Sequence, residues 1–114
     1  WGHAEDYVEA MWLMLQQDKA DDYVIATGKT HTIKDFINKC LTKLEITSFN
    51  NGDEFLDSHG NYIIKTNPKF VRPAEVDLLV GDSSKAKKEL LWKPKHDLDS
   101  LVNDMIQADL KRYG

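Results

Sequence analysis

The sequence predicts a mixed α/β chain, in which helix–strand–helix units of an open sheet precede a small α+β region with a hairpin. The main observation is a short apolar run at residues 23–27, between longer stretches of helical apolar periodicity at 4–17 and 30–44. Continuous apolar character over so few residues is typical of a strand buried on both faces. A lone strand leaves both edges unpaired, so we expect residues 4–44 to be the last units of a sheet whose other strands lie outside this chain.

The two helices that flank this run carry recognisable start signals. In the first, Asp6 followed three residues later by Glu9 resembles a capping box. In the second, Thr32 is a favourable N-cap with Asp35 three residues on. The first helix also has a wide apolar face, which predicts cover on more than one side. That face includes Val8, Met11, Trp12 and Leu15.

The second half of the chain predicts a hairpin and two further helices. Residues 46–49 and 62–66 are strand-like, and the polar, turn-rich residues 50–61 between them indicate an antiparallel hairpin with a long loop. Two helical stretches follow, with Asp82 and Asp97 as their caps.

The composition limits the classes of function. The formal net charge is −4, and charges of both signs are interspersed, which argues against a nucleic-acid partner. No apolar run is long enough for a bilayer and no signal peptide is recognisable, so we expect a cytoplasmic protein without a membrane partner. The single cysteine, Cys40, permits no intrachain disulfide, fits a reduced setting, and has the apolar neighbours of a structural thiol. A chain that starts at Trp1 without Met is expected to be a fragment.

The most informative polar group is Arg72 and Glu75, on either side of Pro73. A guanidinium has the planar fork that grips a diphosphate through two parallel charge-assisted hydrogen bonds. A carboxylate three residues on can accept hydrogen bonds from a ribose diol. From spacing alone, a surface ion pair between the two side chains is the commoner alternative.

Other candidate groups indicate less. The four histidines show no metal-ligand spacing, so we expect no metal site. Trp1 and His3 either line a pocket or pack at a helix entry. The lysines at 85, 87 and 88 either attract phosphate or form a solvated helix face. The histidines are His3, His31, His59 and His96.

Signatures of catalysis and of cofactor binding are missing from the sequence. The six glycines form no dinucleotide-binding loop, no Tyr is followed by Lys four residues later, and no Ser-His-Asp order with a nucleophile elbow is present. We therefore expect no catalytic, cofactor-binding or metal-binding residues within this chain.

Four segments of the sequence carry a resemblance to a known family. They are residues 1–16, WGHAEDYVEAMWLMLQ; residues 23–28, YVIATG; residues 72–79, RPAEVDLL; and residues 81–94, which contain GD, KAK and WKP. Together they resemble the GDP-mannose 4,6-dehydratase family. The first two are similar to the segment that opens the last third of those enzymes and to the strand after it, and the last two are similar to the family's R-P-T-E-V-D block and its closing motif.

This resemblance implies a fold and a function. The complete enzyme is an extended short-chain dehydrogenase/reductase, with an NADP-binding Rossmann domain and a smaller domain that binds the nucleotide sugar. It converts GDP-mannose to GDP-4-keto-6-deoxymannose, a precursor of GDP-fucose. By this resemblance, residues 1–44 are the tail end of the Rossmann domain and residues 45–114 the sugar-nucleotide domain. Arg72 then contacts the diphosphate and Glu75 the ribose of GDP-mannose, and the catalytic residues precede Trp1.

The chain departs from the family's pattern at three positions. Ala74 replaces a common Thr, and Val71 replaces a common aromatic residue. Leu91 replaces the glycine of a common Leu-Gly-Trp, which argues against a left-handed helix end there.

Two alternatives remain open at the level of sequence. One is an epimerase or reductase of another nucleotide sugar. The other is a non-enzymatic module that associates with itself through the open edge at 23–27 and the apolar face around Trp12. These two features lead us to expect a homo-oligomer, with a dimer as the simplest form.

Overall fold

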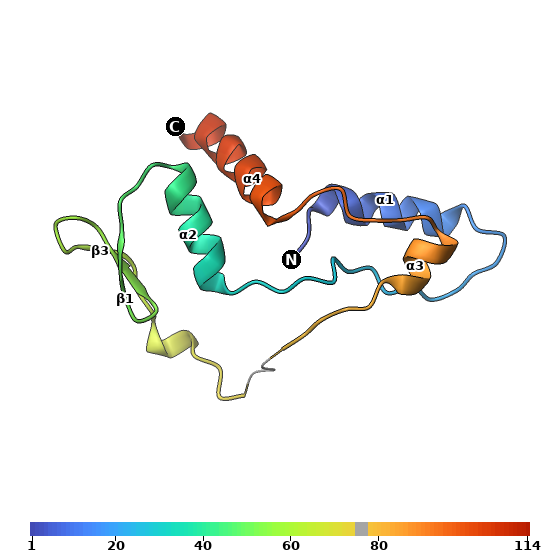
Figure 1. The fold of residues 1–114 in the computed structure, drawn as a ribbon, viewed down its shortest axis with the longest axis horizontal. Helices are drawn as coiled ribbons and strands as arrows, with labels where there is room; N and C mark the ends of the chain where they lie inside the picture. Colours follow the sequence, from blue (N-terminus) through green and yellow to red (C-terminus); the bar gives the residue numbers. More distant parts are fainter. Residues whose placement is uncertain (75–77) are drawn as a thin grey trace. The chain divides into compact units, whose positions relative to one another are not determined.

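The structure is a computed structural model that describes residues 1–74 and 78–114, and the chain forms two compact units (Figure 1). Unit 1 comprises Trp1–His31 with Leu78–Gly114, and unit 2 comprises Thr32–Asp77. Unit 1 contains three helices: α1 (Ala4–Leu15), α3 (Ser84–Glu89) and α4 (Leu98–Tyr113). Unit 2 contains the helix α2 (Ile33–Lys43), the strands β1 (Phe49–Asn51), β2 (Glu54–Leu56) and β3 (Tyr62–Ile64), and a 3-10 helix, η1 (Pro68–Phe70).

These elements confirm the mixed helix-and-strand character and all four predicted helices, each shorter than or offset from its predicted range by a few residues. The division into units does not follow the domain boundary expected after residue 44, which stays a prediction. Among the described residues, none of the helices combines the length and the apolar content that crossing a bilayer requires.

The core of unit 1 lies where α1, α3 and the segment after α3 meet. Four side chains are almost completely buried there, and four partly buried ones pack around them. Trp92 is 2% exposed, and its indole Nε1 donates a hydrogen bond to the carbonyl of Asp6 at 2.8 Å, so its polar atom is satisfied inside the core. The buried four are Ala10, Ala86, Leu90 and Trp92, and the surrounding four are Leu13, Met14, Tyr23 and Ile25.

The strand predicted at residues 23–27 is not formed, although two of its apolar side chains are partly buried, as predicted. Tyr23 and Ile25 pack against the core of unit 1, but within residues 1–74 and 78–114 no strand pairs with them. A strand needs a hydrogen-bonded neighbour, and the one sheet of the described chain belongs to unit 2. The run instead lies against Gly81, where a Cβ would clash with the Cβ of Ala26. Glycine at 81 thus permits the close approach of the two segments.

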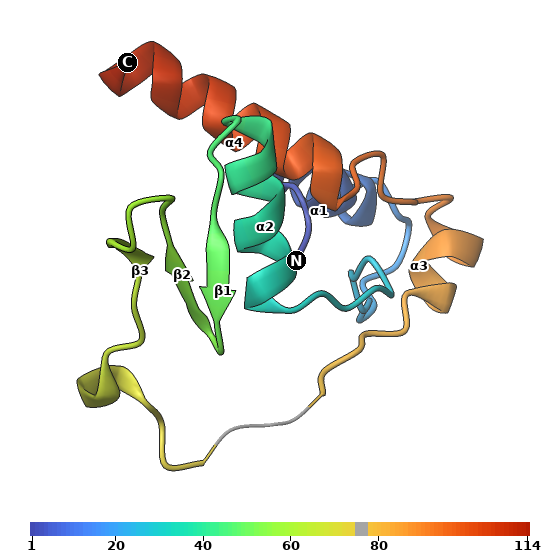
Figure 2. The same cartoon turned by 60° about the vertical axis from the view of Figure 1, so that its left-hand side comes forward.

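Unit 2 contains a three-stranded antiparallel sheet of order β1-β2-β3, and Figure 2 shows the three strands side by side in this order. The long loop predicted at residues 50–61 is therefore wrong, because β2 lies within it. The β1–β2 turn has Gly52 at φ +63° as the first of its two central residues, the position where a tight hairpin favours glycine. Phe55 pairs with Asn50 on one side and Ile64 on the other, and its side chain is 1% exposed.

Two of the predicted helix starts are confirmed by reciprocal hydrogen bonds. Thr32 Oγ1 accepts from the Asp35 N–H at 3.0 Å, while the Asp35 carboxylate accepts from the Thr32 N–H at 2.9 Å. At α4, Asp97 and Ser100 form the same kind of capping box. Hydrogen bonds donated to the Asp97 carboxylate, first from the Ser100 backbone, hold its pKa below the usual value.

The capping box predicted from Asp6 and Glu9 is wrong. The N-cap of α1 is His3, whose Nδ1 accepts a hydrogen bond from the Glu5 N–H at 3.2 Å. The helix therefore begins at Ala4, two residues before Asp6, which places Asp6 inside the first turn and frees its carboxylate for another part of unit 1.

Two of the helices, α2 and α3, are followed by left-handed residues that are not glycine. After α2, Glu45 has φ +56°, and the Ile46 N–H bonds back to the Leu41 carbonyl, as in a Schellman motif. After α3, Leu91 has φ +55°. The sequence argued against a left-handed end at Leu91, so this expectation is corrected. The Trp92 N–H bonds to the Ala86 carbonyl at 3.3 Å, and Trp92 enters the core through this turn.

We predict that Leu91→Gly stabilises the chain. The Leu91 side chain is 84% exposed, so its removal costs little burial, while a left-handed Leu carries about 1–2 kcal/mol of steric strain. After subtracting the larger backbone entropy of Gly in the unfolded chain, we expect a gain of about 1 kcal/mol in the free energy of unfolding, measured with urea. Ala108→Gly, at an exposed position inside α4, is the control and should lose about 1 kcal/mol. An unchanged or lower stability of Leu91→Gly would contradict this account.

Candidate functional site

The predicted substrate-binding pair is only partly described. Arg72 lies just after η1, and its side chain is exposed. The backbone before it is fixed, because the Asn67 side chain accepts from the Lys69 N–H at 3.0 Å and the Val71 N–H donates to the Pro68 carbonyl at 3.2 Å. Glu75 lies outside the described residues, so its place beside Arg72 stays a prediction.

A second polar group, which the sequence did not single out as a site, joins the two ends of the chain. Asp6 is 2% exposed, and its two carboxylate oxygens accept the backbone N–H groups of Lys95 and His96, each at 3.0 Å. The ammonium of Lys95 forms an ion pair with Glu9 at 2.8 Å, one turn further along α1. The first turns of α1 therefore hold the segment that leads into α4.

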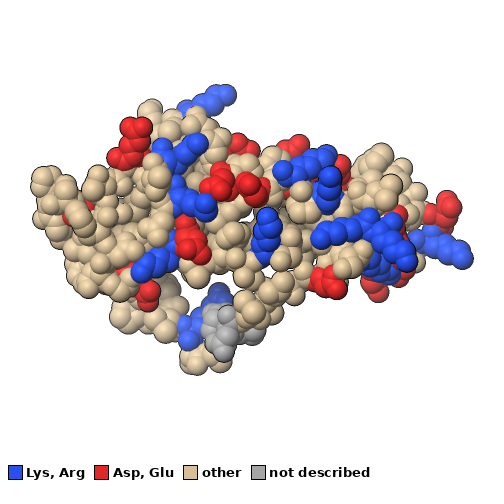
Figure 3. Space-filling model, in the orientation of Figure 1, with Lys and Arg blue, Asp and Glu red and all other residues tan. Residues whose placement is uncertain are grey.

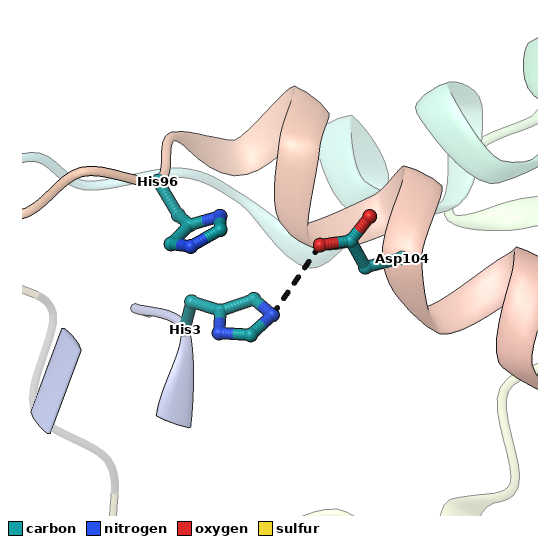
Figure 4. A group of neighbouring side chains, drawn as sticks. All are labelled: His3, His96 and Asp104. Atoms are coloured by element: carbon teal, nitrogen blue, oxygen red, sulfur yellow. Dashed lines mark ion pairs between the residues drawn. The ribbon is translucent and has the colours of Figure 1, made fainter. Parts of the chain in front are cut away.

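Two stacked histidines lie beside this clamp. The rings of His3 and His96 are 4.1 Å apart and inclined by 19°. Nε2 of His3 is 3.5 Å from Asp104 on α4, as Figure 4 shows, and Nε2 of His96 is 3.5 Å from Glu5 on α1. Each ring thus faces one carboxylate, and these contacts link α1, α4 and the segment between α3 and α4.

The ligand atoms of His3, His96 and Asp104 lie within 4.8 Å of one another, but the group does not fit a metal ion. An ion lies in the plane of each imidazole that binds it, and two nearly parallel stacked rings share no such position. A ligating His also donates its second ring N–H, whereas Nδ1 of His3 accepts a hydrogen bond from Glu5. The geometry suits a stacked, hydrogen-bonded pair that fastens α1 to α4.

A small cavity lies next to the clamp. It measures about 130 Å³, well below the roughly 300–1,000 Å³ of a site for a drug-sized ligand. Trp1 lines it, as one of the two alternatives for Trp1 and His3 anticipated, whereas His3 does not and instead caps α1. His96 and the lysines Lys29 and Lys95 line it as well. The cavity has room for water or a small ion but not for a nucleotide sugar.

A larger pocket belongs to unit 2. It measures about 410 Å³ and lies between α2 and the sheet. Its walls come from the first turns of α2, from Phe55 and Asp53 of the β1–β2 hairpin, and from residues 64–66.

The lysine-rich face of α3 is partly engaged inside unit 1. Lys85 bonds the Asp22 carbonyl at 2.9 Å, forms an ion pair with Asp21 at 2.7 Å, and lies 4.8 Å from the centre of the Tyr23 ring. The Lys85 ammonium lowers the pKa of Asp21 through their hydrogen bond, and the same bond raises the pKa of Lys85. Lys85 therefore holds the segment before Tyr23 against α3. Figure 3 shows basic and acidic side chains interspersed on the face drawn.

Cys40 is half-buried in α2, and burial raises the pKa of its thiol. A protonated thiol is a weak nucleophile, which fits the structural role expected from the sequence.

The sequence contained only faint signals for these groups. Asp6 had the spacing of a capping residue, and its long-range partners are backbone atoms, which no side-chain pattern reveals. The histidines are far apart in sequence and come together only when α1 and the segment before α4 meet.

Comparison with known proteins defines the class of this α/β chain. Residues 1–105 match the family model described as GDP-mannose 4,6 dehydratase. Enzymes of that name align over 97% of the chain with 50% identity in Drosophila melanogaster and 44% in Homo sapiens, and over 98% with 39% identity in Yersinia enterocolitica. The chain covers 29%, 31% and 34% of the length of these three relatives.

A family match of this extent identifies a sequence of the sugar-nucleotide dehydratase class. The chain belongs to the GDP-mannose 4,6-dehydratase family, as its motifs indicated.

We predict that the clamp dominates the stability of unit 1. Asp6→Ala removes two charge-assisted hydrogen bonds and leaves the N–H groups of Lys95 and His96 unpaired, so the free energy of unfolding should fall by about 3 kcal/mol in urea titrations. Asp6→Asn keeps the volume and one good acceptor, and should lose about half as much. Asp109→Ala, on the exposed face of α4, should change stability by no more than about 0.5 kcal/mol. If Asp6→Ala and Asp109→Ala changed the free energy of unfolding equally, the clamp would not dominate the stability of unit 1.

Proposed function

We propose that this chain is the substrate-binding portion of a GDP-mannose 4,6-dehydratase, which converts GDP-mannose to GDP-4-keto-6-deoxymannose on the route to GDP-fucose. The observation that carries the proposal is the alignment of nearly the whole chain with enzymes of that name. Because the chain covers about a third of their length, the reaction belongs to a larger protein, and this part supplies contacts to the nucleotide sugar.

Within this portion, Arg72 binds the diphosphate of GDP-mannose and Glu75 binds the ribose. Arg72 is exposed, and it follows a 3-10 helix fixed by a side-chain cap and a proline, so its backbone is held while its guanidinium reaches solvent. A held backbone lowers the entropic cost of aligning the planar fork with two phosphate oxygens.

The NADP of the parent enzyme is bound by other sequence. The described chain does not fit a dinucleotide loop, because the apolar run 23–27 is followed by a single glycine, Gly28, and then by coil until α2 begins at Ile33. The phosphate loop and the catalytic residues of the Rossmann domain therefore lie elsewhere in the parent, and residues 1–44 are the tail end of that domain. This chain by itself is inactive, and the parent works in the cytoplasm.

We predict that the chain binds GDP weakly and that Arg72→Ala weakens this binding roughly tenfold or more, as measured by isothermal titration calorimetry. The loss corresponds to one bidentate, charge-assisted contact. Arg72→Lys keeps the charge but loses the fork, so it should give an intermediate affinity.

Arg112→Ala is the matched control, because Arg112 is the other arginine of the chain and lies in the last turn of α4. It should leave GDP binding unchanged. If Arg72→Ala binds GDP as well as the unmodified chain, Arg72 is not part of the site. A preference for UDP or dTDP over GDP would instead favour an epimerase or reductase of another nucleotide sugar.

The exposed face of α1 favours a second role, self-association. Four apolar side chains on one face of the helix, at positions i, i+3, i+4 and i+7, are each more than half exposed, which is unusual for a helix that is not part of an interface. These are Val8 at 62%, Met11 at 57%, Trp12 at 60% and Leu15 at 82%. We call this set the α1 stripe and propose that it pairs with the same stripe of a second chain in a homodimer.

We predict that sedimentation velocity detects a dimer of the chain at micromolar concentrations. Met11→Glu, near the centre of the α1 stripe, should convert it to a monomer, because burying a carboxylate in an apolar contact is costly. Met105→Glu is the control, because Met105 lies on α4 and is 48% exposed, and this change should leave the dimer intact. A chain that stays monomeric at high concentration contradicts this second role.

A further inference from the structure

The pocket between α2 and the sheet of unit 2, with a volume of about 410 Å³, is large enough for a small organic ligand. All its lining residues belong to unit 2, so it is complete within one compact part of the chain. Arg72 is not among its lining residues, so the pocket is distinct from the proposed GDP-mannose contact. We refer to it as the α2–sheet pocket.

The walls of the α2–sheet pocket are held in place before any ligand arrives. The capping box between Thr32 and Asp35 fixes the start of α2. The ammonium of Lys34 donates to the Gly52 carbonyl at 2.9 Å and so ties this first turn to the β1–β2 turn. Phe55, 1% exposed, anchors the sheet side. Because these walls are already ordered, little conformational entropy is lost when a ligand binds, and this raises the affinity for a ligand that fits.

The lining chemistry selects the kind of ligand. Four apolar residues of α2 and the sheet line it: Ile33, which is 70% exposed, Ile37, Phe55 and Ile64. Lys34 and Lys65 line it as well, with Asp53 as the single acidic residue, and the Lys65 ammonium lies 4.8 Å from the centre of the Tyr62 ring. Lys34 uses one of its three N–H donors on Gly52, which leaves two for a ligand. The excess of positive charge at an apolar pocket suits a molecule with an apolar ring and one anionic group.

We propose that the α2–sheet pocket binds a small aromatic or alicyclic anion, with its ring between Ile37 and Ile64 and its negative group at Lys34 and Lys65. The ring displaces water from apolar walls, and the ammonium groups give the anion charge-assisted hydrogen bonds. Because this site shares no lining residue with the α1 stripe and does not include Arg72, its occupancy is independent of the function proposed above.

The test uses the whole 114-residue chain with 2-naphthoate as the probe, and follows isoleucine and methionine methyl signals by NMR. We expect saturable shifts at Ile33, Ile37 and Ile64, with the Met11 methyl in the α1 stripe unmoved. The double variant Lys34→Gln, Lys65→Gln should weaken 2-naphthoate binding about tenfold, while binding of the uncharged 2-naphthamide stays the same.

The control variant is Lys43→Gln, at the far end of α2, which should leave 2-naphthoate binding unchanged. If the double variant loses its fold, Ile37→Trp provides a second route, because a larger side chain fills the pocket and should abolish the shifts at Ile33 and Ile64. Shifts of the same size at Met11, no saturation, or equal loss of acid and amide binding in the double variant would each overturn the proposal.

Discussion

Unit 1 depends on the carboxylate of Asp6. The two segments that make up this unit are separated in sequence by the residues of unit 2. The segment before α4 is joined to α1 by two backbone N–H groups, which both donate hydrogen bonds to this one side chain. A buried carboxylate is costly unless it is fully hydrogen-bonded, and here two N–H donors occupy its two oxygens. The Asp6 carbonyl accepts the Trp92 indole N–H as well, so one residue fixes both the core tryptophan and the entry to α4.

This clamp also decides which face of α1 is buried. With Asp6 directed at residues 95 and 96, the side of the helix that carries Ala10, Leu13 and Met14 faces Trp92 and α3. The α1 stripe is then directed outward, because residues three and four apart share a face. The apolar exposure of α1 is therefore a consequence of a polar contact in its first turn. An additional surface, from a second chain or from the rest of a longer one, is what such a stripe needs.

The parts of the fold that were predictable from sequence are those governed by neighbours in the chain. Thr32 with Asp35, and Asp97 at α4, act within one helical turn, and both caps formed as expected. The run at 23–27 failed as a strand because strand formation depends on a partner that the local sequence does not contain, whereas its apolar character correctly indicated contact with a core. Leu91 failed for a related reason. The burial of Trp92 outweighs the modest strain of a left-handed leucine, and such tertiary gains are invisible in a residue-by-residue preference.

The same distinction applies to the sites. Arg72 was recognisable because a guanidinium next to Pro73 belongs to a contiguous motif, so the family match covers it directly. The α2–sheet pocket has no such signature, since its walls come from separate segments at residues 32–37, 53–55 and 64–66. The strand β2, which carries the buried Phe55, lies in the segment for which the sequence predicts a loop. The two adjacent apolar residues of β2, Phe55 and Leu56, are too few to distinguish a strand from a turn-rich segment. Pairing on both sides of Phe55 turns that segment into a strand, and only then do Phe55 and Ile64 provide an apolar surface opposite α2.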